Sequence, residues 1–206
     1  MIEVRALVRG FGKHVVLDGV SFTAAPSSRI GLTGSNGSGK TTLLRCLLGT
    51  LTPDGGDVSV GGYSAGALQA RRITGATLSQ ERSFYLRLTG RENLLFFARL
   101  RGVSSRQAKR SVAQVLRELE LESVADQRAD RCSSGQLQQL AFARALLGDP
   151  SVLLLDEPTR SLDTDARARL WRAIDSRPET TVVFATHLAE DVERATQVVQ
   201  LEAAAS

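Results

Sequence analysis

The residues whose types and spacing are best suited to chemistry lie between Gly34 and Thr41, which read Gly-Ser-Asn-Gly-Ser-Gly-Lys-Thr. This order fits the phosphate-binding loop pattern G-x-x-x-x-G-K-[ST]. Glycine tolerates positive φ, so the chain can wrap closely and point successive N–H groups inward at an anion. The residues predicted to contact phosphate are Gly34, Ser35, Asn36, Gly37, Ser38, Gly39, Lys40, Thr41 and Thr42.

The flanking segments are those that such a loop needs. Residues 29–33 are short and apolar enough for a buried strand, and the residues after Thr41 are apolar at helical spacing. A helix beginning near Lys40 would add its positive dipole end to the loop. We expect Lys40 to reach the β- and γ-phosphates and the Thr41 hydroxyl to bind Mg²⁺.

Two adjacent carboxylates, Asp156 and Glu157, follow the continuous apolar run 151–155. Such a run is typical of a central parallel strand, and ligands of open α/β sheets bind outside the carboxyl ends of their strands. One carboxylate can hold Mg²⁺ and the other can orient and polarise a water molecule. The alternative is an acid pair at a helix N-terminus, which the companion phosphate loop disfavours.

Three further features are weak when taken alone. His187 follows a predicted buried strand and can hydrogen-bond a γ-phosphate, although a single histidine in a loop usually has no such role. Gln80 ends another predicted strand, and its amide can touch both a metal and a water. The residues Ser133-Ser134-Gly135-Gln136 open a predicted helix, where exposed N–H groups can form an anion site. Plain capping by serine explains that helix start equally well.

The elements that must position these residues alternate between strand and helix, which predicts a mostly parallel α/β sheet. The predicted strands cover 2–8, 15–22, 29–33, 57–60, 72–79, 151–156, 180–185 and 197–201, with a turn at 9–12. The predicted helices cover 90–100, 105–120, 134–147 and 163–174, with Asp163 as a cap. We therefore expect a nucleotide-binding core from 1–80 and 146–206, and an inserted helical subdomain from 81–145.

Composition limits the class of protein. The hydrophobic fraction of 42% supports a sizeable core, and the net charge of +4 is spread through the chain without a block typical of nucleic-acid binding. Two well-separated cysteines suggest a reducing compartment. The start of the chain has no signal-peptide core, and no apolar run approaches the length of a membrane span.

Taken together, in this order and spacing, these stretches resemble the ATP-binding subunit of an ABC transporter over nearly the whole chain. The resemblance implies a P-loop NTPase core with a mostly parallel sheet, an antiparallel β subdomain and an inserted α-helical subdomain. It also implies ATP and Mg²⁺ as cofactors. Glu157 would be the catalytic base, and Asp156 would bind the metal together with Thr41 and Gln80. His187 and Gln80 would complete the catalytic set.

By the same resemblance, Phe11 would stack on adenine, whereas the sequence alone favours an ordinary core aromatic. The segment 133–136 would contact the nucleotide of a second ATPase subunit, most simply in a homodimer, and Asp163 would lie in the dimer contact. Ser134 stands where the family usually has glycine, which adds a side chain and restricts φ. We expect a competent ATPase, because Glu157 and His187 are both present.

The stretch 81–94, with Phe96 and Phe97, looks like the subfamily that serves bacterial exporters of drugs, polysaccharides and lipids. This resemblance implies a polytopic membrane permease as partner and a cytoplasmic position at the inner face of the cell membrane. The aromatic residues there can form a local core, a docking surface or both. The alternatives are a soluble ATPase acting on ribosomes or DNA and a non-hydrolysing regulatory subunit.

Overall fold

The computed structural model describes residues 1–78 and 84–202. The chain forms two compact units. The first comprises Met1–Ser79, Ser151–Pro158 and Glu179–Ser206, and the second comprises Gln80–Pro150 and Thr159–Pro178. The predicted helical segment 81–145 falls within the bounds of the second unit, which also takes in 159–178.

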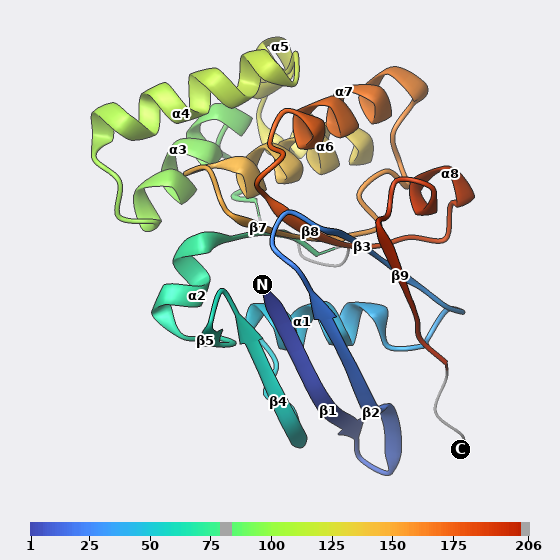
Figure 1. Cartoon of the computed structure of the whole chain (residues 1–206). Helices are drawn as coiled ribbons and strands as arrows, with labels where there is room; N and C mark the ends of the chain where they lie inside the picture. The colour runs from blue at the N-terminus through green and yellow to red at the C-terminus, as the bar shows by residue number, and fades with distance from the viewer. Residues whose placement is uncertain (79–83, 203–206) are drawn as a thin grey trace. The chain divides into compact units, whose positions relative to one another are not determined.

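The first unit contains a five-stranded parallel sheet with strand order β6-β7-β8-β3-β9 (Figure 1). β7 and β8 are buried along their whole length, as expected of central parallel strands. The mostly parallel sheet predicted from the sequence is therefore confirmed. The bounds of its strands are β3 Arg29–Thr33, β6 Thr74–Thr77, β7 Val152–Asp156, β8 Thr181–Ala185 and β9 Gln197–Gln200.

An antiparallel sheet with strand order β2-β1-β4-β5 completes the strands of this unit. Its strands are β1 Ile2–Phe11, β2 His14–Ala24, β4 Gly55–Val60 and β5 Tyr63–Ser64. The helices of the unit are α1 Lys40–Leu48, α2 Leu68–Ile73 and α8 Ala189–Val192. Leu43, Leu44 and Leu47 of α1 share one hydrophobic core with residues of both sheets, so burial on α1 holds the two sheets together.

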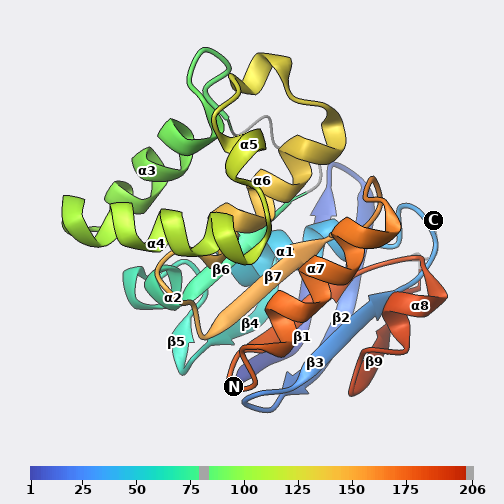
Figure 2. The same cartoon turned by 90° about the horizontal axis from the view of Figure 1, so that it is seen from above.

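The second unit is helical (Figure 2). Its elements are α3 Gly90–Leu100, α4 Ser105–Glu118, α5 Glu122–Ala125, the 3₁₀ turn η1 Ala129–Arg131, α6 Ser134–Leu146 and α7 Thr164–Asp175. The four longer helices begin where the sequence predicts because their N-caps, Thr89, Ser104, Ser133 and Asp163, each accept a backbone N–H. Asp163 is thus confirmed as a cap.

Two sequence predictions in the first unit are wrong in detail. The strand predicted to begin at Arg72 is preceded by α2, which runs to Ile73, so that β6 begins at Thr74. The N-cap of α2 is Ala67, which offers no side-chain cap, so the usual start signal is absent. The turn predicted at 9–12 is also displaced, because β1 continues to Phe11. The positive φ at Ala6 and the register shifts between β1 and β2 interrupt the alternation of inward and outward side chains along β1.

Aromatic side chains gather around the end of α3 in the second unit. The ring centroids of Tyr85 and Phe96 lie 4.9 Å apart, and the Arg144 guanidinium lies 4.9 Å from the centroid of Phe97. Tyr85 is nevertheless 51% exposed. The four rings, those of Phe84, Tyr85, Phe96 and Phe97, pack against one another, but none of them is fully buried, and the docking role raised by the sequence stays a prediction.

An ion pair joins the ends of α4 and α7 within the second unit. Arg177 donates to both carboxylate oxygens of Glu118, one of them at 2.8 Å from Nη2, and the two side chains are only 12% and 23% exposed. The hydrogen bonds from Arg177 hold the pKa of Glu118 below its usual value. Glu118 therefore stabilises the fold above its unfolded-state pKa, and this contribution is lost as the pH falls through its lower folded-state pKa.

Replacing Glu118 with Gln should lower the free energy of unfolding by about 1–3 kcal/mol at neutral pH, because Arg177 keeps its burial and loses its closest counter-charge, with only the exposed Asp149 left at 3.7 Å. Denaturant unfolding measures the loss. The difference between parent and Glu118→Gln should shrink as the pH falls through the lowered pKa of Glu118, because the parent carboxylate then becomes protonated as well. Glu122→Gln, at an exposed site on α5, is the matched control. A difference that is independent of pH would contradict the pairing.

No helix within the described residues is both long and apolar enough to cross a membrane.

Candidate functional site

Three neighbouring strands of the parallel sheet end at the same edge, because parallel strands share a direction. β3 leads into the loop Gly34–Gly39, β7 ends at Asp156, and β8 leads to Thr186 and His187. Since β8 pairs with both β3 and β7, the three endings are adjacent. The predicted loop, the two carboxylates and the histidine therefore lie together at the carboxyl ends of the strands, where open α/β sheets bind ligands.

The loop has the backbone that the glycine spacing predicts. Gly34, Gly37 and Gly39 have φ values of 139°, 85° and 94°. A Cβ at Gly34 would lie 2.3 Å from the carbonyl oxygen of Leu201, and one at Gly39 would lie 2.6 Å from Cδ2 of Leu17. Glycine is needed here both for its dihedral angles and for the lack of space.

Lys40, the first residue of α1, turns its side chain back over this loop. Its Nζ donates to the carbonyl oxygens of Gly34 at 2.7 Å and Ser35 at 2.9 Å, and the residue is only 8% exposed. The N-cap Gly39 provides no side-chain cap, so the first N–H groups of α1 keep no internal partner. A buried cation and a helix N-terminus therefore meet in a loop suited to bind an anion.

The remaining loop residues differ in exposure. Ser35, Asn36 and Gly37 are exposed, whereas Ser38 is 1% exposed and its Oγ makes no hydrogen bond within the described part of the chain. Thr42 is half-buried in the first turn of α1. The exposed tip leaves its backbone N–H groups accessible to a ligand.

A hydroxyl and a carboxylate oxygen meet beside the loop. Thr41 Oγ1 donates to Oδ2 of Asp156 at 2.8 Å, and Asp156 is 4% exposed. These are hard oxygen donors, which suit Mg²⁺. No group of three or more His, Cys, Asp or Glu side chains in residues 1–78 and 84–202 is placed to hold a metal. An ion at Thr41 and Asp156 would therefore take its other ligands from phosphate and water.

The second carboxylate points to a different partner. Glu157 Oε2 lies 2.7 Å from Nδ1 of His187, and the side chains are 13% and 52% exposed respectively. Glu157 has a φ of 50°, in the left-handed region, and its N–H donates to the carbonyl oxygen of Ala185 at 2.9 Å. The strained turn at the end of β7 separates the two adjacent carboxylates, so one lies beside Thr41 and the other beside His187.

Sequence reasoning missed the residues that hold the loop of His187. Thr186 is 1% exposed, accepts from the N–H of Leu188 at 3.1 Å, and donates to Oδ2 of Asp191 at 3.1 Å. Asp191 is completely buried on α8. An acid six residues after the end of a strand carries no recognisable pattern, so only the fold reveals this support.

Replacing Asp191 with Ala should lower the free energy of unfolding by about 1–3 kcal/mol, since it leaves the buried Thr186 hydroxyl without its acceptor. Thermal or denaturant unfolding measures the effect. Asp191→Asn retains an acceptor oxygen and should lose less. Glu193→Ala, at an exposed position just after α8, should change little. Equal stability of Asp191→Ala and Glu193→Ala would show that the buried carboxylate supports nothing.

The segment 133–136 begins α6 in the second unit. Ser133 and Gln136 form a capping box, in which the Gln136 N–H donates to Ser133 Oγ at 3.2 Å and the Ser133 N–H donates to Gln136 Oε1 at 2.8 Å. A Cβ at Gly135 would lie 2.8 Å from the carbonyl oxygen of Ser161. Ser134 is exposed in the first helical turn, where its φ is one that any L-residue adopts. The restriction of φ that a serine brings at this position therefore causes no backbone strain.

The other predicted residues are placed as follows. Asp163 is exposed and accepts from the N–H of Ala166 at 2.8 Å. Phe11 is 49% exposed with the Arg9 guanidinium 4.9 Å from its ring centroid, so its interpretation as a core aromatic is wrong. Gln80 lies outside the described residues.

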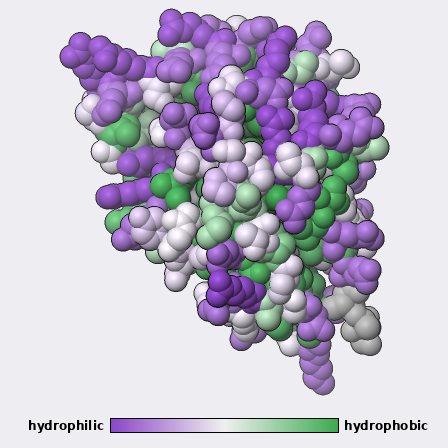
Figure 3. Space-filling view, in the orientation of Figure 1, coloured by the Kyte–Doolittle hydropathy of each residue, from purple (hydrophilic) through white to green (hydrophobic). Residues whose placement is uncertain are grey.

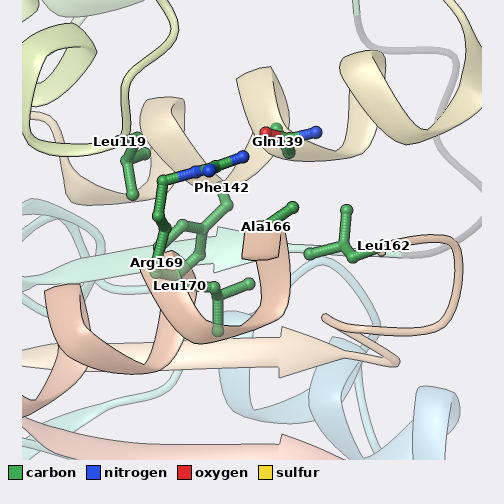
Figure 4. Close-up of a pocket in the computed structure, with 7 residues that line it drawn as sticks. All are labelled: Leu119, Gln139, Phe142, Leu162, Ala166, Arg169 and Leu170. Carbon is green, nitrogen blue, oxygen red and sulfur yellow. The ribbon is translucent and has the colours of Figure 1, made fainter. Parts of the chain in front are cut away.

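A small cavity in the second unit is not part of this site (Figure 4). Its volume of about 10 Å³ is room for about one water molecule. The Arg169 side chain crosses it and pairs with Glu120 at 3.4 Å. The residues that line it are Leu119, Gln139, Phe142, Leu162, Ala166, Arg169 and Leu170. It is a gap in helix packing.

The chain is similar to several known proteins. Two relatives named Nod factor export ATP-binding protein I, from Rhizobium sp. (strain N33) and Paraburkholderia xenovorans (strain LB400), are 39% and 40% identical over 94% of this chain. The chain spans 64% of the length of each. A solved structure described as an ATP-binding subunit of an ABC transporter superposes with a TM-score of 0.88 at 26% identity. The match covers 99% of this chain and 88% of that one.

The family model described as ABC transporter matches residues 17–160, which include the phosphate loop, the segment 133–136 and both carboxylates. The chain belongs to the ABC transporter family.

Proposed function

We propose that this chain is the ATP-binding and ATP-hydrolysing subunit of a membrane ABC exporter. The observation that carries the proposal is the edge of the parallel sheet. There Lys40 lies over a glycine loop, Thr41 meets Asp156, and Glu157 meets His187. Together these groups offer a phosphate cradle, a metal-binding pair and a base.

In the proposed complex, the backbone of Gly34–Gly39 and the first turn of α1 hold the phosphates of ATP. Lys40 exchanges its two carbonyl contacts for phosphate oxygens, which are stronger partners for an ammonium group. The oxygens of Thr41 and Asp156 are the protein ligands that fit Mg²⁺, which supplies charge neutralisation at the phosphates. Phe11 offers an exposed ring for stacking on adenine, and Thr42 adds a hydroxyl to the cradle.

Glu157 is proposed to accept a proton from the water that attacks the γ-phosphate. His187, through Nδ1, fixes the orientation of that carboxylate and leaves Nε2 free to contact the phosphate. Sequence resemblance assigns Gln80 a contact with both the metal and the water.

We further propose that two copies of the chain close on two nucleotides. The segment Ser133, Ser134, Gly135 and Gln136 would present the N-terminus of α6 to the ATP held by the other copy. The exposed Asp163 would lie in the contact between the copies. In the isolated chain Ser133 and Gln136 cap α6. The proposal therefore gives these two residues a second role, contact with the nucleotide of the other copy.

The names of the two relatives, which contain export, support an exporter, and so does the resemblance of 81–97. The polytopic permease would recognise the second unit at the exposed edge of its aromatic cluster, around Tyr85 and Phe96. The chain would then work at the cytoplasmic face of the cell membrane, without a nucleic-acid partner. The alternative, an ATPase acting on ribosomes or DNA, has no specific observation in its favour.

The test is an assay of the purified protein for ATP hydrolysis with and without Mg²⁺, alone and with the membrane protein encoded beside it. We expect Mg²⁺-dependent hydrolysis, and we expect retention on membranes when the permease is co-expressed. Absence of hydrolysis in both preparations would overturn the enzymatic assignment. A ribosome- or DNA-associated pool, in place of membrane retention, would favour the alternative.

A further inference from the structure

The outward face of α4 carries only basic charge. Arg106, Lys109, Arg110 and Arg117, here called the basic stripe, are all exposed. At the pitch of an α-helix they fall within an arc of about 100°. The opposite face, which includes Ala108, Val112 and Val115, is buried in the second unit. In Figure 3 the surface over α4 is strongly hydrophilic.

Within the part of the chain that the structure describes, no acidic side chain neutralises the basic stripe. The sequence contains no Asp or Glu between Asn93 and Arg117. None of the four side chains forms an ion pair with any residue in the described ranges. The two acids at the end of α4 and just after it are engaged elsewhere, since Glu118 pairs with Arg177 and Glu120 with Arg169.

This arrangement weakens the helix, because like charges three and four residues apart repel one another. Arg106 has Lys109 and Arg110 at these spacings. A solvated surface helix ordinarily mixes both signs, which supports its helix and its solubility alike. A single sign along one face is better suited to bind an extended anionic surface.

Apolar and basic groups adjoin the stripe in sequence. α3 ends with exposed Arg99 and with Leu100, which is 67% exposed, just before α4 begins. An exposed leucine between basic residues suits the boundary between lipid headgroups and acyl chains. α4 has 14 residues, so the stripe extends along a straight element of about 20 Å.

We propose that the basic stripe of α4, with Arg99 and Leu100, binds the anionic headgroups of a phospholipid bilayer. This inference rests on the proposed function, which places the chain at a membrane, and adds a contact that does not require the permease. Nucleic acid is the less suitable partner, because the exposed positions from 99 to 117 include no aromatic side chain on which a base could stack.

The test is co-sedimentation of the purified chain, without nucleotide or permease, with two kinds of vesicle. One contains phosphatidylcholine alone and the other equal parts of phosphatidylcholine and phosphatidylglycerol. We expect binding to the anionic vesicles only, and weaker binding at high salt. The combined replacement Arg106→Gln, Arg110→Gln and Arg117→Gln should lower the partition coefficient by on the order of 100-fold, at about fivefold for each charge.

The matched control is Lys13→Gln, Arg71→Gln and Arg172→Gln, which removes the same charge from exposed positions elsewhere. This control should bind nearly as well as the parent, as should the charge-preserving replacement of the three α4 arginines by Lys. Far-ultraviolet circular dichroism of each variant checks that the helices remain folded.

Equal losses in the two glutamine variants would mean that net charge alone drives binding and would overturn the site. The site would also be overturned if the parent did not bind anionic vesicles, or if duplex DNA displaced the chain from them at equal phosphate concentration. Hydrolysis of ATP is measured separately on the same proteins. A failure of vesicle binding with intact hydrolysis therefore overturns this inference and leaves the proposed function standing.

Discussion

Replacing Glu157 with Gln is expected to lower the rate of ATP hydrolysis by about 100- to 10,000-fold while ATP remains bound. The amide preserves the shape of the side chain and its hydrogen bond with His187, and removes the base that would accept the proton of the attacking water. Because bound ATP is no longer consumed, the closed pair of subunits should persist. Size-exclusion chromatography with saturating ATP should then show a dimer.

Glu193→Gln makes the same chemical change at an exposed position after α8 and should retain the parent rate. Retention of full hydrolysis by Glu157→Gln would remove Glu157 from the proposed mechanism. A variant that hydrolyses slowly, binds ATP and stays monomeric would leave the base in place and contradict the proposed two-copy site.

Replacing Lys40 with Ala is expected to weaken ATP binding by about 100-fold or more, which can be measured by calorimetry or with a fluorescent nucleotide. The loop would lose a buried cation aimed at the phosphates, and charge-assisted hydrogen bonds are among the strongest that a protein makes. Hydrolysis should fall with binding. Glu157→Gln and Lys40→Ala are thus expected to separate the chemical step from the binding step.

Arg45→Ala, which removes a positive charge from the last turn of the same helix, should leave the dissociation constant for ATP nearly unchanged. The thermal midpoint of both variants shows whether the helix remains packed. Unchanged ATP affinity in a folded Lys40→Ala protein would exclude the loop Gly34–Gly39 as the phosphate site.

The parts of the fold that were predictable from sequence are those with a strong local signal. The buried run 151–155 indicated a central strand, and Ser133 and Asp163 marked helix starts at which the structure places caps. α2 was not predicted, because its N-cap, Ala67, has no side chain that could cap the helix. β1 was predicted too short because residues 9–11, with Gly10 and Gly12, have the local pattern of a turn but pair with β2 in the structure, and a local pattern does not carry that information.

The site shows the same division. The glycine spacing from Gly34 to Gly39 was enough to predict positive φ at the loop, because only backbone chemistry was involved. That Asp191 supports Thr186, five residues before it, depends on how the chain turns between β8 and α8. That Asp156 contacts Thr41 and Glu157 contacts His187 depends on strands that are distant in sequence and adjacent in the sheet. Contacts between residues far apart in the chain become visible only once the sheet is known.

At Glu157, the left-handed backbone lowers the stability of the fold, while the side chain is the base proposed for ATP hydrolysis. A non-glycine residue at this φ is held there at a cost of about 1–2 kcal/mol, which glycine would not incur. Selection for thermal stability alone would therefore favour glycine at 157, and the proposed base would be lost. Engineering of this protein for heat resistance should leave position 157 unchanged and seek its gains in the second unit or on the antiparallel sheet.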